Sequence, residues 1–162
     1  MSKKSAGLLM YRGDAGGLEV LLAHPGGPFW AKKDEGVWSI PKGEFSDNED
    51  PLAAAGREFE EETGMAPRGD FIPLTPLRQQ SGKVVFAWAV QGDFNPASLT
   101  SNVFSLEWPP GSGRMREFPE VDRAEWLTLE AAMRKILPGQ APFLRELAEK
   151  LDRQSRHPGG TG

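Results

Sequence analysis

A chain of 162 residues with no cysteine and a net charge of −4 is long enough to bury its own core, and it cannot use disulfides or thiolate metal ligands. Because 19 basic residues face 23 acidic ones, no large positive field is available for gripping duplex nucleic acid. No apolar window of about 18 residues occurs. We therefore expect a cytoplasmic protein without membrane or duplex nucleic-acid partners, with one domain over residues 1–155 and a flexible tail over 156–162.

The first half of the chain alternates apolar runs with turns. Strands are predicted at 6–12 and 18–25, which form a hairpin, and at 37–43, the stretch "VWSIPKG". Residues 51–64 then predict an α-helix, because Asp50 is a suitable cap, Pro51 suits the first helical position and Gly64 ends the pattern.

The second half predicts strands first and helices last. Strands are expected at 71–80, 83–92 and 102–108. The Pro- and Gly-rich stretch 109–120 is long and polar, which favours a functional loop. Residues 124–137 predict a short strand that runs into a helix, and 141–154 an amphipathic helix with its apolar residues at helical spacing (Phe143, Leu144, Leu147 and Leu151). Together these elements predict a mixed α+β sandwich.

Carboxylates gather on one side of the predicted helix 51–64. With Phe59 at the centre of the buried face and about 100° per residue, Glu58, Glu61 and Glu62 fall in one arc beside that face. Neighbouring carboxylates on a helix repel by about a few tenths of a kcal/mol per pair, a cost that a bound cation removes. Carboxylate oxygens suit hard ions such as Mg²⁺ or Mn²⁺, although a solvated acidic face would show the same pattern.

The stretch from residue 43 to residue 65 resembles the signature of the Nudix hydrolase family, G-x5-E-x7-R-E-U-x-E-E-x-G-U, where U is apolar. Every specified position is filled, by Gly43, Glu49, Arg57, Glu58, Phe59, Glu61, Glu62, Gly64 and Met65. The flanking stretches "VWSIPKGE" and "EVDRAEWLTLEAA" are also similar to that family. The resemblance implies an α/β/α sandwich around a mixed β-sheet, and hydrolysis of a nucleoside diphosphate that is linked to another group.

The metal site follows from the helix geometry and the resemblance together. Glu58 and Glu62 lie one turn apart, so both are expected to bind the same Mg²⁺ or Mn²⁺, with Glu61 completing a site for a further ion. The backbone carbonyl of Lys42 is expected to be another ligand, presented by a sharp turn at Gly43.

Other charged residues take supporting roles. Arg57 and Glu49 resemble the structural ion pair of the family. The side chains of Lys42 and Lys32, or of Lys33, are expected to neutralise phosphate oxygens, and the alternative for the latter two is plain surface charge.

The reaction also needs a base that activates the attacking water. The candidates are Glu58 and two late carboxylates, Glu117 and Glu120. Glu120 precedes Trp126 by six residues, which resembles the late glutamate of the dinucleoside polyphosphate branch. There it would be catalytic as a base or a metal ligand, and the alternative is a surface carboxylate.

The substrate is less well defined by the sequence. Trp30 and Trp108 are candidates for stacking on a base, and core packing is the alternative. The stretch "SIPKGE" resembles the diadenosine tetraphosphate and diphosphoinositol polyphosphate branches, with Glu44 where several of those enzymes have His. Neither His24 nor His157 is expected to be catalytic.

The resulting prediction is a metal-dependent pyrophosphohydrolase, monomeric or homodimeric, that acts on a small nucleotide. The expected substrate is a dinucleoside polyphosphate or a nucleoside triphosphate, with ADP-ribose as an alternative. Hydrolysis of RNA 5′ ends is a further alternative that should come with a basic groove. A catalytically silent nucleotide-binding module is another, against which the intact Glu58 and Glu62 argue.

Overall fold

The computed structural model describes residues 3–13 and 16–156. The strands of its main sheet are β1 (Lys4–Arg12), β2 (Glu19–Pro25), β3 (Lys42–Glu44), β4 (Phe71–Pro73), β5 (Leu77–Arg78), β6 (Val84–Gln91) and β9 (Val121–Thr128). The order is β4-β6-β1-β2-β9, with β3 paired to β1 and β5 paired to β6. Since β1 runs parallel to β6 and antiparallel to β2, the sheet is mixed.

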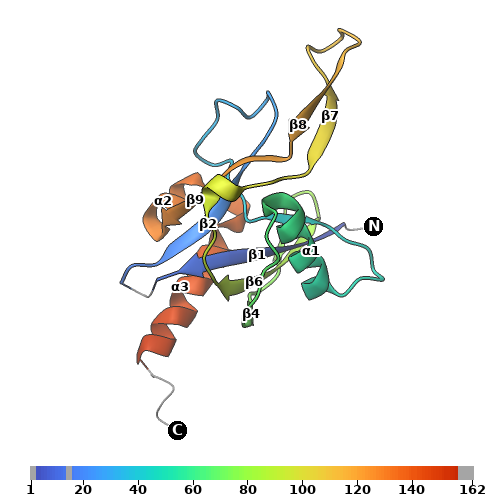
Figure 1. Ribbon diagram of the computed structural model, residues 1–162. Coiled ribbons are helices and arrows are strands. Elements are labelled where there is room, and N and C mark those ends of the chain that lie inside the picture. The colour runs from blue at the N-terminus through green and yellow to red at the C-terminus, as the bar shows by residue number, and fades with distance from the viewer. Residues whose placement is uncertain (1–2, 14–15, 157–162) are drawn as a thin grey trace.

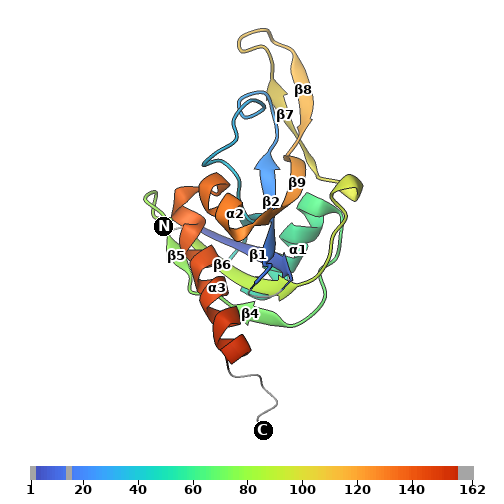
Figure 2. The ribbon, with the colours of Figure 1, turned by 90° about the vertical axis from the view of Figure 1, so that its left-hand side faces the viewer.

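Helices cover both faces of this sheet (Figures 1 and 2). On one face, α1 (Pro51–Thr63) packs its Phe59 with Leu8 and Met10 of β1. On the other face, α2 (Leu129–Lys135) and α3 (Ala141–Arg156) pack with the alternate residues Leu9 and Tyr11. The side chains of β1 therefore divide between two cores by strand alternation. The predicted α+β fold, an α/β/α sandwich around a mixed sheet, is confirmed.

Local signals fix the ends of α1. The Asp50 carboxylate accepts the Ala53 N–H at 3.0 Å and caps the first turn. At the other end Gly64 has a positive φ of 88°, and its N–H donates to the Glu60 carbonyl at 2.7 Å. Phe59 is fully buried, as the predicted helix face requires.

The strand predicted at 37–43 is shorter in the structure. Only Lys42–Glu44 forms a strand, and it pairs with β1. Before it, Ser39 bridges to Ala23 of β2, and Trp38 bridges to Ile136. The segment crosses from one neighbour to another, so no single partner supports a continuous strand. The segment predicted at 71–80 likewise becomes two short strands, β4 and β5, which both pair with β6.

The prediction of a loop over 109–120 is wrong for residues 115–119. Met115–Pro119 forms β8, which pairs with β7 (Val103–Glu107) in a two-stranded hairpin that projects from the main sheet (Figure 1). The Glu107 carboxylate accepts the N–H groups of Gly111 and Gly113 and closes the turn. The Pro and Gly residues correctly indicate this turn. The exposed residues of β8 give no apolar alternation from which a strand could be predicted.

The predicted flexible tail 156–162 lies outside the described residues except for Arg156, which ends α3. His157 is therefore also outside them. Within residues 3–13 and 16–156, no helix is both long enough and apolar enough to cross a membrane.

Candidate active site

The end of β3 meets α1 at Gly43. A Cβ at this position would lie 2.1 Å from the carboxyl carbon of Glu58, so the carboxylate occupies the space that any side chain would fill. The Glu58 side chain is only 12% exposed there. Gly43 is not among the described glycines with positive φ, so the sharp turn expected at this residue is absent. The glycine is needed for close approach of Glu58 and not for a turn.

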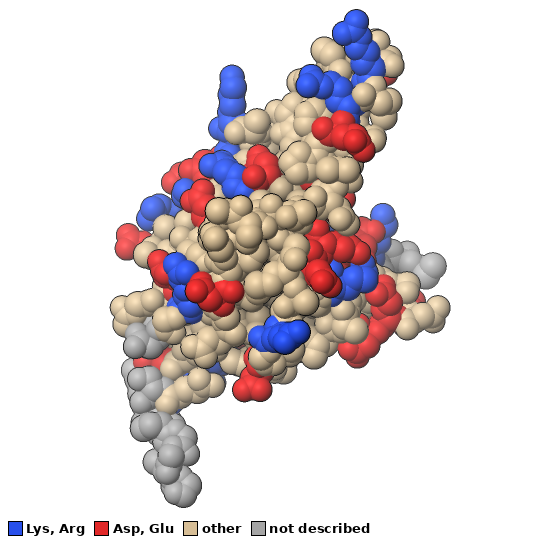
Figure 3. All heavy atoms as spheres, in the orientation of Figure 1, with Lys and Arg blue, Asp and Glu red and all other residues tan. Residues whose placement is uncertain are grey.

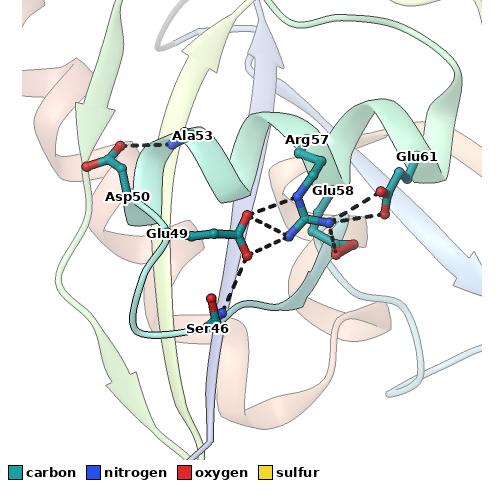
Figure 4. A network of polar contacts seen from close by, with 7 residues as sticks. All are labelled: Ser46, Glu49, Asp50, Ala53, Arg57, Glu58 and Glu61. Carbon is teal, nitrogen blue, oxygen red and sulfur yellow. Dashed lines mark hydrogen bonds and ion pairs between the residues drawn. The ribbon is translucent and has the colours of Figure 1, made fainter.

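Arg57 connects three carboxylates, Glu58 and Glu61 of α1 and Glu49 of the segment before the helix (Figure 4). Its Nε and Nη2 donate to the two oxygens of Glu49 at 3.1 and 3.2 Å. Its Nη1 donates to Glu58 at 3.0 Å and to Glu61 at 3.3 Å. The structure thus brings Arg57 and Glu49 together. The contact with Glu61 was not anticipated, although a spacing of four residues on a helix could have suggested it.

Glu62 lies one turn after Glu58 on α1, and it also faces β3. Its carboxyl accepts a hydrogen bond from the Lys42 backbone N–H. Burial, followed by the negative charge of Glu58, raises the pKa of Glu62 to about 8, and Glu120 adds to this effect. Burial, followed by Glu61, also raises the pKa of Glu58. Two neighbouring carboxyl groups are therefore held where their negative charges are disfavoured.

The residue types at this site fit a hard divalent cation. Carboxylate oxygens from adjacent turns of one helix are the ligands that Mg²⁺ and Mn²⁺ prefer, and a positive charge would offset the mutual repulsion of Glu58 and Glu62. Over the described part of the chain, no three Asp, Glu, His or Cys side chains converge on one point. Glu58 and Glu61 are instead paired with Arg57. The contact seen for the Lys42 backbone is made by its amide, so a carbonyl ligand stays a prediction.

A pocket of about 260 Å³ opens beside Glu62. Lys42, Glu62 and Glu120 supply its charged lining, and Trp30 and Val37 belong to its apolar lining. Burial, followed by the charge of Lys83, lowers the pKa of Lys42. The pocket therefore combines ionisable groups with an aromatic surface, as sites for small charged ligands do.

The remaining candidates lie further out. Trp108 does not line the pocket and packs edge-on against Phe29, with ring centroids 5.3 Å apart. Lys32 is exposed and also lies outside the lining. Glu117 is exposed on β8, opposite Ser105. Of the two late carboxylates, only Glu120 reaches the pocket.

His24 is fully buried below the loop formed by residues 26–36. Its Nδ1 lies 2.8 Å from Asp122, and its Nε2 lies 2.6 Å from the Lys33 carbonyl. Both ring nitrogens are thus engaged in anchoring the loop to β9.

Lys83 was missed by the sequence analysis. Its Nζ lies 3.2 Å from Glu44, which places a second positive charge near Lys42. The proximity depends on β6 and β3 both pairing with β1, which no local pattern indicates.

Comparison with known proteins agrees with this geometry. The NUDIX domain family model matches residues 1–147. The chain is 30% identical over 142 residues to the RNA pyrophosphohydrolase of Agrobacterium fabrum. The match covers 76% of this chain and 74% of that protein. It is 31% identical over 115 residues, or 71% of its length, to an octanoyltransferase of Myxococcus xanthus, of whose length it spans only 28%.

The solved structures agree at the level of the fold. An Ap4A hydrolase of C. elegans matches with a TM-score of 0.63 at 24% identity, and the match covers 91% of this chain and 98% of that one. Since the family model extends over most of the chain, including the complete signature at residues 43–65, the chain belongs to the Nudix hydrolase family.

Proposed function

We propose that the protein is a metal-dependent pyrophosphohydrolase that cleaves a phosphoanhydride bond in a dinucleoside polyphosphate or a nucleoside triphosphate by in-line attack of water. The observation that carries the proposal is the pocket in which Lys42, Glu62 and Glu120 share the lining with Trp30. Such a pocket can receive the phosphates at its charged end and a base at its aromatic end.

The charged groups in and beside the pocket each have a chemical role in this reaction. Glu58, Glu61 and Glu62 would hold Mg²⁺ or Mn²⁺, which when bound neutralises phosphate charge and lowers the pKa of a coordinated water. The half-buried Lys42 would pair with a phosphate oxygen, because a nearby anion restores the charged form that burial disfavours.

Glu120 is the preferred general base. It is exposed where it lines the pocket, so its carboxylate is free to take a proton from the attacking water. Glu58 is the alternative base, but its carboxylate is held by Arg57 at 3.0 Å. Trp30 would stack on the base of the nucleotide. We propose further that the protein works in the cytoplasm, as a monomer or a homodimer.

A nucleotide panel tests the proposal. Purified protein is incubated with Mg²⁺ and diadenosine tetraphosphate, ATP or ADP-ribose, and the products on both sides of the cleaved anhydride are separated and quantified: nucleotides, ribose 5-phosphate, phosphate and pyrophosphate. We expect kcat/KM for the tetraphosphate to exceed that for ADP-ribose by about tenfold, or about 1.4 kcal/mol. The reverse order would reject the substrate assignment and leave the fold untouched. Exposed Glu60 supplies the matched control: Glu62→Gln should abolish turnover, and Glu60→Gln should preserve it.

RNA 5′ ends are the second candidate substrate. The support is the 30% identity to a protein named RNA pyrophosphohydrolase over most of its length. The test is pyrophosphate release from a short RNA with a 5′ triphosphate, compared with ATP at equal concentration. A kcat/KM for the RNA below that for ATP would reject this candidate.

A further inference from the structure

The projecting hairpin of β7 and β8 carries its opposite charges on opposite faces. Directly paired residues of an antiparallel ladder share a face, and neighbours along a strand alternate. One face carries Phe104, Leu106, Arg116 and Phe118. The other carries Ser105, Glu107, Met115 and Glu117. Both glutamates of these strands therefore lie on the face opposite Arg116. The first face is called the aromatic face below.

The aromatic face packs against the loop formed by residues 26–36. A Cβ on Gly27 would lie 2.9 Å from the ring of Phe104, so the loop backbone lies directly on the aromatic face. Trp108, which follows β7, contacts Phe29 of the loop in a T-shaped arrangement at 5.3 Å. Figures 1 and 2 show the loop and the hairpin side by side at one end of the molecule. They form one continuous surface.

Aromatic and basic side chains alternate over this surface. Phe29 is 56% exposed and Trp30 is 39% exposed, and Trp30 also lines the pocket beside Glu62. The Lys33 ammonium lies 5.0 Å from the Trp30 ring centroid. On the hairpin, the Arg116 guanidinium lies 5.9 Å from the ring centroid of Phe118. Exposed rings beside cations are the elements with which proteins bind single-stranded nucleic acids.

The positive charges of this surface are not neutralised by the protein. Among the described residues, no ion pair is formed by Lys32 or Lys33 of the loop, or by Arg114 and Arg116 of the hairpin. Figure 3 shows Lys and Arg at the tip of the hairpin, with acidic side chains beside them lower on the hairpin and a further acidic cluster over α1. The loop and the hairpin contain as many acidic as basic residues, but Asp34 and Glu35 of the loop pair with Lys135 and Arg134. Because Glu107 and Glu117 lie on the other face of the hairpin, the cations beside the aromatic face stay unpaired next to the pocket.

We propose that the loop 26–36 and the aromatic face of the hairpin bind single-stranded RNA whose 5′ end enters the pocket beside Glu62. Bases stack on Phe29 and Trp30, and phosphates pair with Lys33, Arg114 and Arg116. For hydrolysis of the RNA 5′ end in the pocket, the inference rests on the proposed function. For binding of the RNA chain, it rests on the hairpin and the loop alone. A duplex cannot offer unstacked bases to these rings, so it is the weaker ligand.

Binding is measured by fluorescence anisotropy with a single-stranded RNA of about ten nucleotides that carries a 5′ hydroxyl, in chelator. The double variant Arg114→Gln/Arg116→Gln should bind about tenfold more weakly than the wild type. Its slope of log K against log salt should be less negative by about 1.4, because each lost phosphate contact on a single strand contributes about 0.7. The matched control is Arg78→Gln/Arg145→Gln, two exposed arginines elsewhere that also form no ion pair within the described chain.

The proposal is overturned if the hairpin variant binds RNA like the control, or if a duplex of the same sequence binds as tightly as the single strand. The RNA used has no anhydride, so its binding does not depend on turnover. If the protein binds RNA but hydrolyses no nucleotide, the proposed function is rejected and the proposed RNA-binding surface is retained. Hydrolysis of small nucleotides without RNA binding would reject the surface alone.

Discussion

Replacing Glu62 by glutamine should make the stability of the metal-free protein much less sensitive to pH. Burial and the charge of Glu58 raise the pKa of Glu62 from 4.5 to about 8. Between these values the folded protein keeps a proton that the unfolded chain has released, so the free energy of unfolding falls as pH rises. The slope is at most about 1.4 kcal/mol per pH unit. From about pH 5 to about pH 7.5 the contribution of this one group is about 3 kcal/mol.

Urea unfolding followed by tryptophan fluorescence, in excess chelator at several pH values, measures this effect. The wild type and Glu60→Gln should lose stability in parallel over the interval, because Glu60 is exposed on the other flank of α1. Glu62→Gln should lose about 3 kcal/mol less than they do. If the pH dependence of stability for Glu62→Gln parallels that of the wild type, Glu62 is not buried beside Glu58, and the packing of α1 against β3 at the site is wrong.

Four further outcomes are expected. Gly43→Ala should lower kcat by about a hundredfold, which corresponds to about 2.7 kcal/mol, with little effect on urea unfolding. The reason is that the alanine Cβ would lie 2.1 Å from the carboxyl carbon of Glu58 and would displace the flexible end of that side chain. Glu120→Gln should lower kcat and leave Mn²⁺ affinity by calorimetry unchanged if Glu120 is the base, whereas weaker Mn²⁺ binding would make it a ligand. Phe59→Ala should lower the free energy of unfolding by about 3–5 kcal/mol in the same urea assay, since the ring is fully buried. Mg²⁺ at about a hundred times its Kd should stabilise the wild type by about 2.7 kcal/mol, and Glu62→Gln measurably less.

The helix and its carboxylates could be predicted because their signals are local. Asp50, Pro51 and Gly64 mark the ends of α1, and a period of 3.6 residues places Phe59 in the core. The same periodicity separated Glu60, which is exposed, from the other three glutamates. The mixed sheet followed from the family resemblance rather than from any strand pattern.

The contacts that complete the site depend on tertiary pairing. The role of Gly43 was predicted wrongly because its neighbour Glu58 is fifteen positions away and meets it only after β3 joins β1. Lys83 approaches Glu44 through the same sheet. Only β8 was taken for part of a loop, because four of its five residues are exposed and it lacks the apolar alternation of a core strand.

The central claim is that the carboxylates of α1 serve a metal-dependent hydrolysis of a nucleotide anhydride. The most direct test is the initial rate of diadenosine tetraphosphate hydrolysis by the purified protein as Mg²⁺ is titrated from full chelation to saturation. The account predicts no turnover under chelation, a saturable rise with Mg²⁺ and no such rise for Glu62→Gln. Turnover that persists under exhaustive chelation, or a Glu62→Gln variant that responds to Mg²⁺ like the wild type, would contradict it.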